Sequence, residues 1–94
     1  MKVLHVDENH PVLVEGLKNL GFQNDLAYKD NLTSILAKID QYEGLIIRSR
    51  FSVDEAFLLN AKKLKFIGRV GAGLENIDID ALKKHNIHLV NSPE

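Results

Sequence analysis

Short apolar runs alternate along this sequence with longer segments in which hydrophobic residues recur at helical spacing. The apolar runs predict strands at residues 2–6, 24–28, 44–48, 64–70 and 87–90, of which the second is the weakest. The run at 44–48 is apolar on consecutive positions, which is typical of a parallel sheet covered on both faces. A strand followed by a helix therefore recurs about every 21 residues.

The first two intervals between strands each predict a helix with a recognisable boundary. Leu13, Leu17 and Leu20 fall on one helical face, and Gly21 then provides a stop signal. In the second interval, Asn31 can cap a helix whose apolar positions are 32, 35, 36 and 39.

The third and fourth intervals also carry helix signals. Ser52 and Glu55 form an S-x-x-E capping box, which predicts the start of a third helix with Phe57 and Leu59 available for packing. Asp78 can cap a short fourth helix that has basic residues in its last turn, where the helix dipole favours positive charge.

This alternation predicts the α/β class, as a flavodoxin-like open parallel sheet of five strands in the order 2-1-3-4-5 with helices on both faces. Residues 1–94 form one domain, because a chain of this length holds one core. The last strand is followed only by Asn91-Ser92-Pro93-Glu94. We therefore expect a sheet that lacks its last helix, in a chain cut from a longer protein.

Composition excludes several classes of protein. The chain is 45% hydrophobic, has a net charge of −1 and contains no cysteine. These values exclude disorder, disulfides and thiolate chemistry, and they give no basis for binding nucleic acid or a membrane surface. No apolar run approaches the ~20 residues of a membrane helix, and the start does not read as a signal peptide, so we expect a cytoplasmic location.

Two polar loops follow neighbouring strands of the predicted sheet. The third strand ends in Arg48-Ser49-Arg50, where two guanidiniums beside a helix start could bind an anion. The fourth runs into Val70-Gly71-Ala72-Gly73, whose glycines let main-chain N–H groups approach a ligand. Either loop alone is equally explained as solvated surface or a tight turn. Their adjacency in the order 2-1-3-4-5 favours an anion site.

Other chemistries fit these loops poorly. The Gly71-Ala72-Gly73 run is not a dinucleotide fingerprint, because Asn76 stands where a small third residue is needed and no long helix follows directly. The four histidines lack the spacing of a zinc site, so no metal is expected. Asp7 and Glu8 resemble the acids of a phosphoacceptor receiver domain, but Arg48 ends the strand that would carry the phosphorylated aspartate.

Three ordered stretches make the sequence recognisable. Residues 44–50, 64–78 and 85–93 resemble the N-terminal half of the D-isomer-specific 2-hydroxyacid dehydrogenases, closely over 44–93 and loosely before that. The Arg48-Ser49-Arg50 run is most similar to family members that act on D-3-phosphoglycerate in serine biosynthesis. The resemblance implies an N-terminal part of a substrate-binding domain, with an NAD-binding domain that is absent from this chain.

The resemblance also implies roles for particular residues. Arg48 and Ser49 would recognise the carboxylate or phosphate of a small 2-hydroxy or 2-oxo acid. The main-chain N–H groups of Val70, Gly71 and Ala72 would bind the carboxylate, and Arg50 and Gly73 are secondary candidates. Catalytic and NAD-binding residues would lie in the nucleotide domain, so none is assigned here. The parent protein would be an NAD-dependent oxidoreductase, and this chain alone would be inactive.

Two other functions stay open from the sequence. A free-standing regulatory module that binds small anions is the alternative, and a degenerate receiver-like signalling domain is a remote one. The resemblance implies a homo-oligomeric parent whose dimer depends largely on the nucleotide domain. This chain is then expected to be monomeric, or to self-associate through its uncovered flank.

Overall fold

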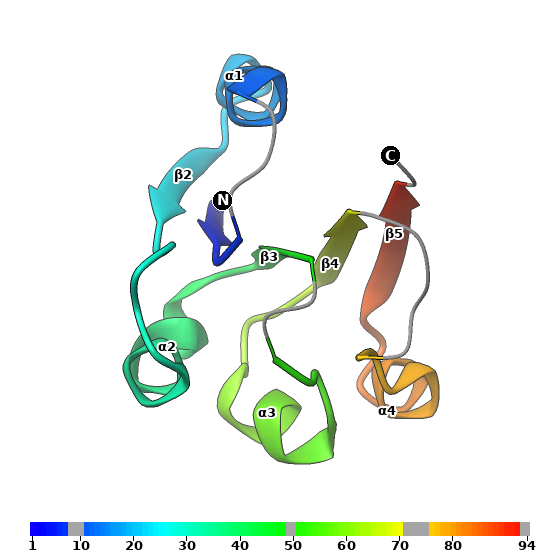
Figure 1. Ribbon diagram of the computed structural model, residues 1–94. Coiled ribbons are helices and arrows are strands. Elements are labelled where there is room, and N and C mark those ends of the chain that lie inside the picture. The colour runs from blue at the N-terminus through cyan, green and yellow to red at the C-terminus, as the bar shows by residue number, and fades with distance from the viewer. Residues whose placement is uncertain (8–10, 49–50, 71–75, 93–94) are drawn as a thin grey trace.

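The computed structural model describes residues 1–7, 11–48, 51–70 and 76–92 of the chain. Five strands form one parallel sheet in the order β2-β1-β3-β4-β5, which confirms the predicted fold class (Figure 1). The strands are β1 (Lys2–His5), β2 (Gln23–Leu26), β3 (Gly44–Ile47), β4 (Phe66–Val70) and β5 (His88–Ser92).

Helices cover both faces of this sheet, as the alternation predicted. They are α1 (Pro11–Asn19), α2 (Leu32–Lys38) with its 3₁₀ extension η1 (Ile39–Gln41), α3 (Glu55–Asn60) and α4 (Ile79–Lys84). Figure 1 shows α1 on one face and α2, α3 and α4 together on the other. None of the described helices is long and apolar enough to cross a membrane.

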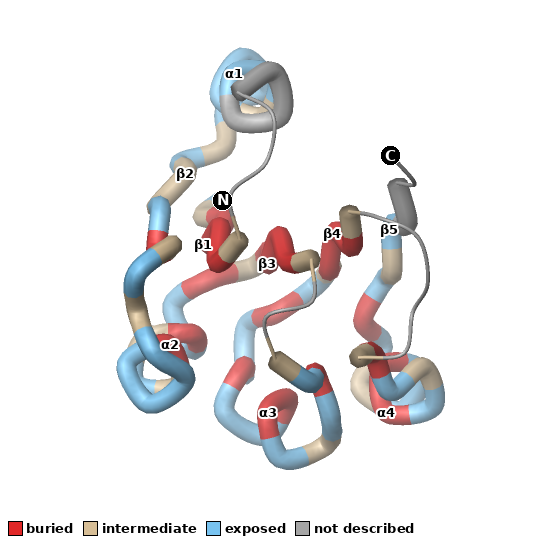
Figure 2. Tube along the Cα trace, viewed as in Figure 1, coloured by how far each residue is buried: buried red, intermediate tan, exposed pale blue. Residues whose placement is uncertain are grey.

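The core lies between the sheet and the three helices α2, α3 and α4. Alternate strand residues point into it, and Figure 2 shows the three central strands buried along their length. The fully buried side chains Leu4, Leu45 and Ile67 come from β1, β3 and β4. On the opposite face, α1 is the one described helix, and a groove of about 190 Å³ beside it is lined mainly by Leu17, Ile46, Phe66, Gly68 and Val90.

The ends of the helices confirm most of the predicted signals. Gly21 has a φ of 91° and its N–H donates to Lys18 O, while the N–H of Phe22 reaches Leu17 O. This left-handed glycine ends α1 in a Schellman motif. Asn31 caps α2 through the Ser34 N–H, and Asp78 caps α4 through the Ala81 N–H.

The predicted capping box at the start of α3 is wrong by two residues. Asp54, not Ser52, caps this helix, and its carboxylate accepts from the main-chain N–H of Phe57 at 3.0 Å. The cause is Val53, which is held extended in a parallel bridge with Ile77. A helix cannot begin at Ser52 while the next residue pairs as a strand.

Asp54→Ala is therefore expected to lower the free energy of unfolding by about 1 kcal/mol, the usual cost of losing an N-cap. Ser52→Ala is the matched control and should change it by less than about 0.5 kcal/mol, because this exposed side chain caps nothing. Urea unfolding of both variants measures the difference. Equal losses would contradict the assignment of the cap.

Two leucines that the periodicity placed on packing faces are exposed instead. Leu20 is 76% exposed because α1 ends at Asn19, one residue before it. Leu59 is 60% exposed, and its neighbour Leu58 packs in the core together with Phe57. The two-residue shift in the start of α3 leaves only six residues of helix, too few for periodicity to choose among adjacent leucines.

The edge strand β2 is held by polar contacts rather than by apolar packing. Asn24 Oδ1 lies 2.8 Å from His5 Nε2, and the Tyr42 hydroxyl donates to Asp25 Oδ2 at 2.6 Å. Burial and this carboxylate raise the pKa of Tyr42 to about 12, so the hydroxyl keeps its proton. These contacts explain a strand that its sequence, Gln-Asn-Asp-Leu, predicts only weakly.

His5 is a fully buried side chain of β1, and its Nδ1 has no hydrogen-bond partner among the described residues. Burial lowers the pKa of His5, and the hydrogen bond to Asn24 opposes this only in part. Below its ordinary pKa of 6.5 the unfolded chain therefore binds more protons than the folded one.

Stability should therefore fall as the pH drops below about 6.5, with a slope of at most about 1.4 kcal/mol per pH unit from this group. His5→Leu should remove that part of the slope, and His88→Gln, at an exposed position, should keep it. Urea unfolding between pH 7.5 and pH 5 measures all three proteins. A slope that is unchanged in His5→Leu would show that other groups cause it.

Candidate functional site

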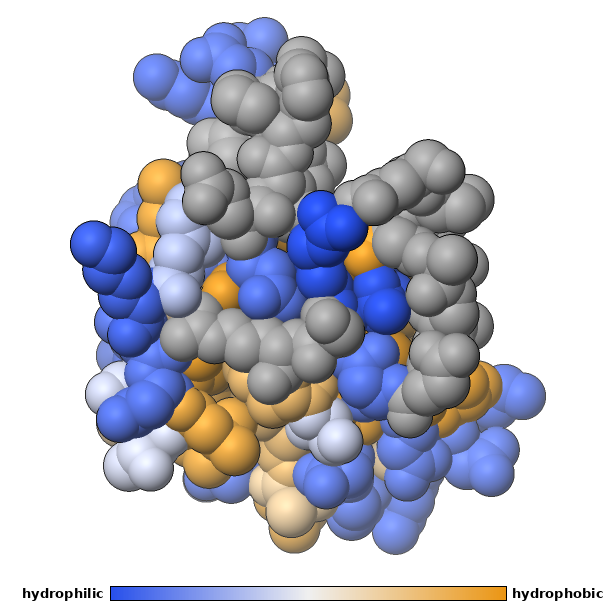
Figure 3. Space-filling view, in the orientation of Figure 1, coloured by the Kyte–Doolittle hydropathy of each residue, from blue (hydrophilic) through white to orange (hydrophobic). Residues whose placement is uncertain are grey.

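The parallel register brings the first residue of each predicted loop, Arg48 and Val70, to one edge of the sheet. Ile47 of β3 pairs with Arg69 of β4, so Arg48 and Val70 follow at the carboxyl ends of neighbouring strands. This confirms the adjacency that the strand order predicted. Figure 3 shows hydrophilic surface gathered in the middle of this face, over the ends of β3 and β4. We call this region, which contains Asp7, Arg48, Arg69, Val70 and Asn76, the carboxyl edge.

Arg48 is held at the carboxyl edge through its main chain. Its N–H donates to Asp7 Oδ2 at 2.7 Å, and its carbonyl accepts from Asn76 Nδ2 at 3.1 Å. Asp7 follows β1, and Asn76 precedes α4, so the contacts come from two different parts of the fold. These two hydrogen bonds fix the main chain of the half-buried Arg48 where it follows β3.

Arg69 is a second cation at this edge, and it is almost completely buried. Only 5% of the Arg69 residue is exposed. Nε donates to Asn76 Oδ1 at 3.1 Å and Nη1 to the carbonyl of Val70, and both acceptors are neutral. Arg69 forms no ion pair with any carboxylate of the described residues. Burying a charge with no opposite charge is costly, so an anion near Arg69 would be strongly favoured.

The structure describes only two of the seven predicted site residues. Arg48 lies as just set out, and Val70 is half-buried at the end of β4, where its carbonyl accepts from Arg69. The others lie outside the described residues, namely Ser49, Arg50, Gly71, Ala72 and Gly73. Their predicted roles stay predictions.

Three residues of the carboxyl edge were missed as site residues by the sequence reasoning. The sequence relates Asp7 only to the acids of a receiver domain, and it relates Asn76 only to the dinucleotide fingerprint that this residue excludes. Arg69 had a visible signal, because an arginine inside an apolar strand must find a partner when the strand is buried. No local pattern indicates that Asp7 and Asn76 contact Arg48, because these contacts join residues 41 and 28 positions apart.

The described residues do not fit a dinucleotide. Asn76 stands at the third position of the fingerprint, where close packing needs a small residue, and its side chain makes three hydrogen bonds there. The helix that follows begins at Ile79 and has six residues.

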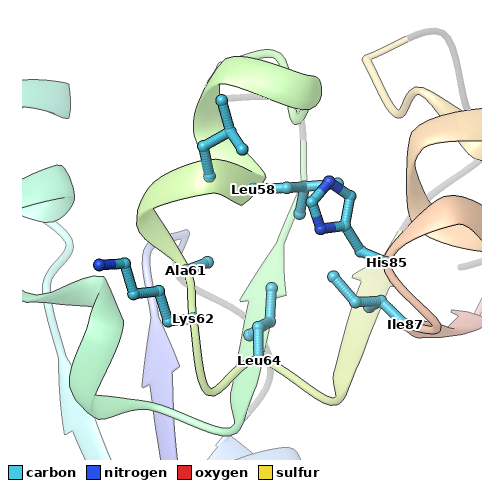
Figure 4. Close-up of a pocket in the computed structure, with 7 residues that line it drawn as sticks. Leu58, Ala61, Lys62, Leu64, His85 and Ile87 are labelled. Atoms are coloured by element: carbon cyan, nitrogen blue, oxygen red, sulfur yellow. The ribbon is translucent and has the colours of Figure 1, made fainter.

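A second cavity, of about 280 Å³, lies at the opposite edge of the sheet, below α3 and α4 (Figure 4). Its lining combines the apolar residues Leu58, Leu59, Ala61, Leu64 and Ile87 with the polar residues Lys62 and His85. His85 borders it and lies 3.0 Å from Glu55 Oε2, while the ammonium of Lys62 points away from His85.

The fold and the carboxyl edge define an open parallel α/β domain with a cationic site at the carboxyl ends of its central strands. The family model for the D-isomer specific 2-hydroxyacid dehydrogenase catalytic domain matches residues 3–94. This chain belongs to that family.

Relatives of known name agree with this assignment. D-3-phosphoglycerate dehydrogenase of Archaeoglobus fulgidus is 31% identical over 93 residues, which cover 99% of this chain and 18% of the relative. The NAD+-bound 3-phosphoglycerate dehydrogenase of Entamoeba histolytica has a TM-score of 0.77 at 29% identity, over 97% of this chain and 32% of that one. D-lactate dehydrogenase of Escherichia coli shares the fold, with a TM-score of 0.81 at 20% identity over 100% of this chain and 31% of that one. The chain thus spans less than a fifth of the curated relatives' length.

Proposed function

We propose that this chain is the substrate-binding segment of an NAD-dependent D-2-hydroxyacid dehydrogenase whose preferred substrate is D-3-phosphoglycerate. The observation that carries the proposal is the pair of arginines, Arg48 and Arg69, at the ends of β3 and β4, of which Arg69 is buried and forms no ion pair with a carboxylate of the described residues. The reaction would oxidise D-3-phosphoglycerate to 3-phosphohydroxypyruvate, a step of serine biosynthesis in the cytoplasm.

The charges of the substrate favour phosphoglycerate over smaller acids. D-3-phosphoglycerate carries a carboxylate and a phosphate, and guanidinium groups bind both with paired hydrogen bonds. Arg48 with Ser49 would take one anionic group, with Arg50 in support. The main-chain N–H groups of residues 70–72 and the buried cation of Arg69 would take the other. D-lactate carries a single charge and would leave half of these groups without a partner.

The redox chemistry would be supplied from outside this chain. In the parent protein, bound NAD would supply the hydride-transfer chemistry for oxidation at C2 of the substrate. The residues of this chain would bind and orient the acid, and the homo-oligomeric parent would provide the rest of the cleft. We therefore expect no turnover from the chain alone.

An NMR titration of the ¹⁵N-labelled chain tests the proposal. Addition of 3-phosphoglycerate at millimolar concentration should shift the amide signals of Arg48 and Val70 and the Nε–H signal of Arg69. D-lactate should cause smaller shifts at the same concentration, because it has one anionic group. Shifts spread over the surface, or none at the carboxyl edge, would contradict the proposal.

A free-standing anion-binding regulatory module is the second candidate, because the cations of the carboxyl edge would serve it equally well. The reading frame beyond codon 94 distinguishes the two. A frame that continues into a strand followed by G-x-G-x-x-G, with an acid about 20 residues later, supports the dehydrogenase. A stop codon supports the regulatory module.

A further inference from the structure

Asn76 connects three segments that meet at the carboxyl edge. Its Nδ2 donates to the main-chain carbonyls of Arg48 and Phe51, each at 3.1 Å, and its Oδ1 accepts from Arg69 Nε at 3.1 Å. One half-buried amide thus joins the end of β3, the segment before α3 and the buried cation of β4. The main chain of Asn76 adds a fourth contact, because its carbonyl accepts from Val53 N at 2.7 Å.

These contacts require both halves of the amide. The NH₂ group has two hydrogens and meets two carbonyls, and the oxygen meets one guanidinium. Aspartate could accept from Arg69 but could not donate to the carbonyls of Arg48 and Phe51. Alanine could do neither. An asparagine is therefore chemically matched to this position in a way that a simple turn residue would not need to be.

The neutrality of the amide matters as well as its geometry. Asn76 Oδ1 orients Arg69 without cancelling its charge, since an amide oxygen carries no net charge. A carboxylate in the same place would form an ion pair with Arg69 and repel an arriving anion. Arg69 is thus held in place and still has its full positive charge available.

Arg48 is fixed from the same point. Its carbonyl is held by Asn76 and its N–H by Asp7, so both polar groups of its main chain have side-chain partners. Asn76 contacts the main-chain carbonyl of Arg48 and the guanidinium of Arg69, so it fixes the point where the Arg48 side chain leaves the main chain relative to the Arg69 guanidinium. A ligand with two anionic groups that binds both arginines depends on that relative position.

We propose that Asn76 is a positioning residue that aligns the main chain of Arg48 with the guanidinium of Arg69 and leaves the charge of Arg69 uncompensated for a substrate with two anionic groups. This inference rests on the proposed function, because it concerns the same site. It predicts that Asn76 acts on the selectivity between ligands as well as on stability. A ligand with two anions should depend on the alignment more than a ligand with one.

Two variants separate alignment from charge. Asn76→Ala removes the side chain that links the main chain of Arg48 to Arg69 but leaves both positive charges. The affinity for 3-phosphoglycerate should therefore fall about 10-fold or more, with a smaller loss for inorganic phosphate. Asn76→Asp keeps the contact to Arg69 but adds a negative charge that compensates the guanidinium, so the affinities for both ligands should fall. Asn60→Ala is the matched control, because its amide donates only to Ala56 O on the exposed side of α3.

Dissociation constants for both ligands come from NMR titrations of the 94-residue chain and its three variants. The inference is overturned if Asn76→Ala lowers the affinity for both ligands equally, or if Asn76→Asp binds 3-phosphoglycerate within twofold of the wild type. Should Asn76→Ala fail to fold, Asn76→Asp decides, since it preserves the size of the side chain. If the wild-type chain binds no 3-phosphoglycerate, the proposed function itself is contradicted. If the wild type binds it and the Asn76 variants bind it equally well, only the inference about Asn76 is contradicted.

Discussion

Replacing Arg48 by alanine is expected to lower the affinity of the chain for 3-phosphoglycerate between about 10-fold and 100-fold. A charge-assisted hydrogen bond contributes about 1.5–3 kcal/mol, and each 1.4 kcal/mol is a factor of ten. The fold should survive, because Asp7 and Asn76 hold Arg48 through its main chain, which the alanine variant keeps. The loss would therefore report the guanidinium and not the loop.

An isothermal or NMR titration measures this effect, with circular dichroism to confirm that the variant is folded. Lys62→Ala is the matched control, since it removes an exposed cation beside the cavity at the opposite edge of the sheet. It lowers the net charge by the same amount and should leave the affinity within about twofold. If the two variants lose affinity equally, binding reflects the overall charge and the carboxyl edge is not the site.

Leu45→Ala is expected to have the largest effect on stability, a loss of about 3–4 kcal/mol in the free energy of unfolding. Leu45 is fully buried in β3, the central strand, and its side chain lies in the core between the sheet and the helices. Truncation would leave a cavity that a sheet paired on both sides cannot close. A domain of this size has only about 5–15 kcal/mol of total stability, so the loss is a large part of it.

Leu59→Ala provides the comparison, because it makes the same chemical change at a side chain that is 60% exposed. Its effect should stay below about 0.5 kcal/mol. Urea unfolding of both variants measures the difference, and thermal unfolding should show Leu45→Ala melting lower by roughly 4–8 °C per kcal/mol. A loss in Leu59→Ala as large as that in Leu45→Ala would contradict the burial of these two residues.

The order of the elements and the parallel sheet were predictable because their signals are local. Consecutive apolar residues at 44–47 indicate a strand buried on both faces, and Gly21 and Asn31 mark helix ends through their own main-chain geometry and side chain. The strand order 2-1-3-4-5 is one of the few orders that short right-handed connections allow, and the structure confirms it. The adjacency of Arg48 and Val70 follows from that order.

Features set by distant contacts were predicted poorly. The cap of α3 moves from Ser52 to Asp54 because Val53 pairs with Ile77, which is 24 positions away. The polar strand β2 is stabilised by His5 and Tyr42, and neither contact is visible in its own four residues. Local propensity describes what a segment prefers alone, and these partners change that preference.

By itself, the sequence determined the α/β class, the five-strand order and the resemblance to a family, because hydrophobic period and motif spacing are properties of neighbouring residues. Only the tertiary structure decided which leucine of α3 is buried, that Arg69 is a buried cation, and that Asn76 joins it to Arg48. Each of these depends on residues far apart in the chain. Burial and hydrogen-bond partners are fixed by packing, which the chain acquires only when its segments meet.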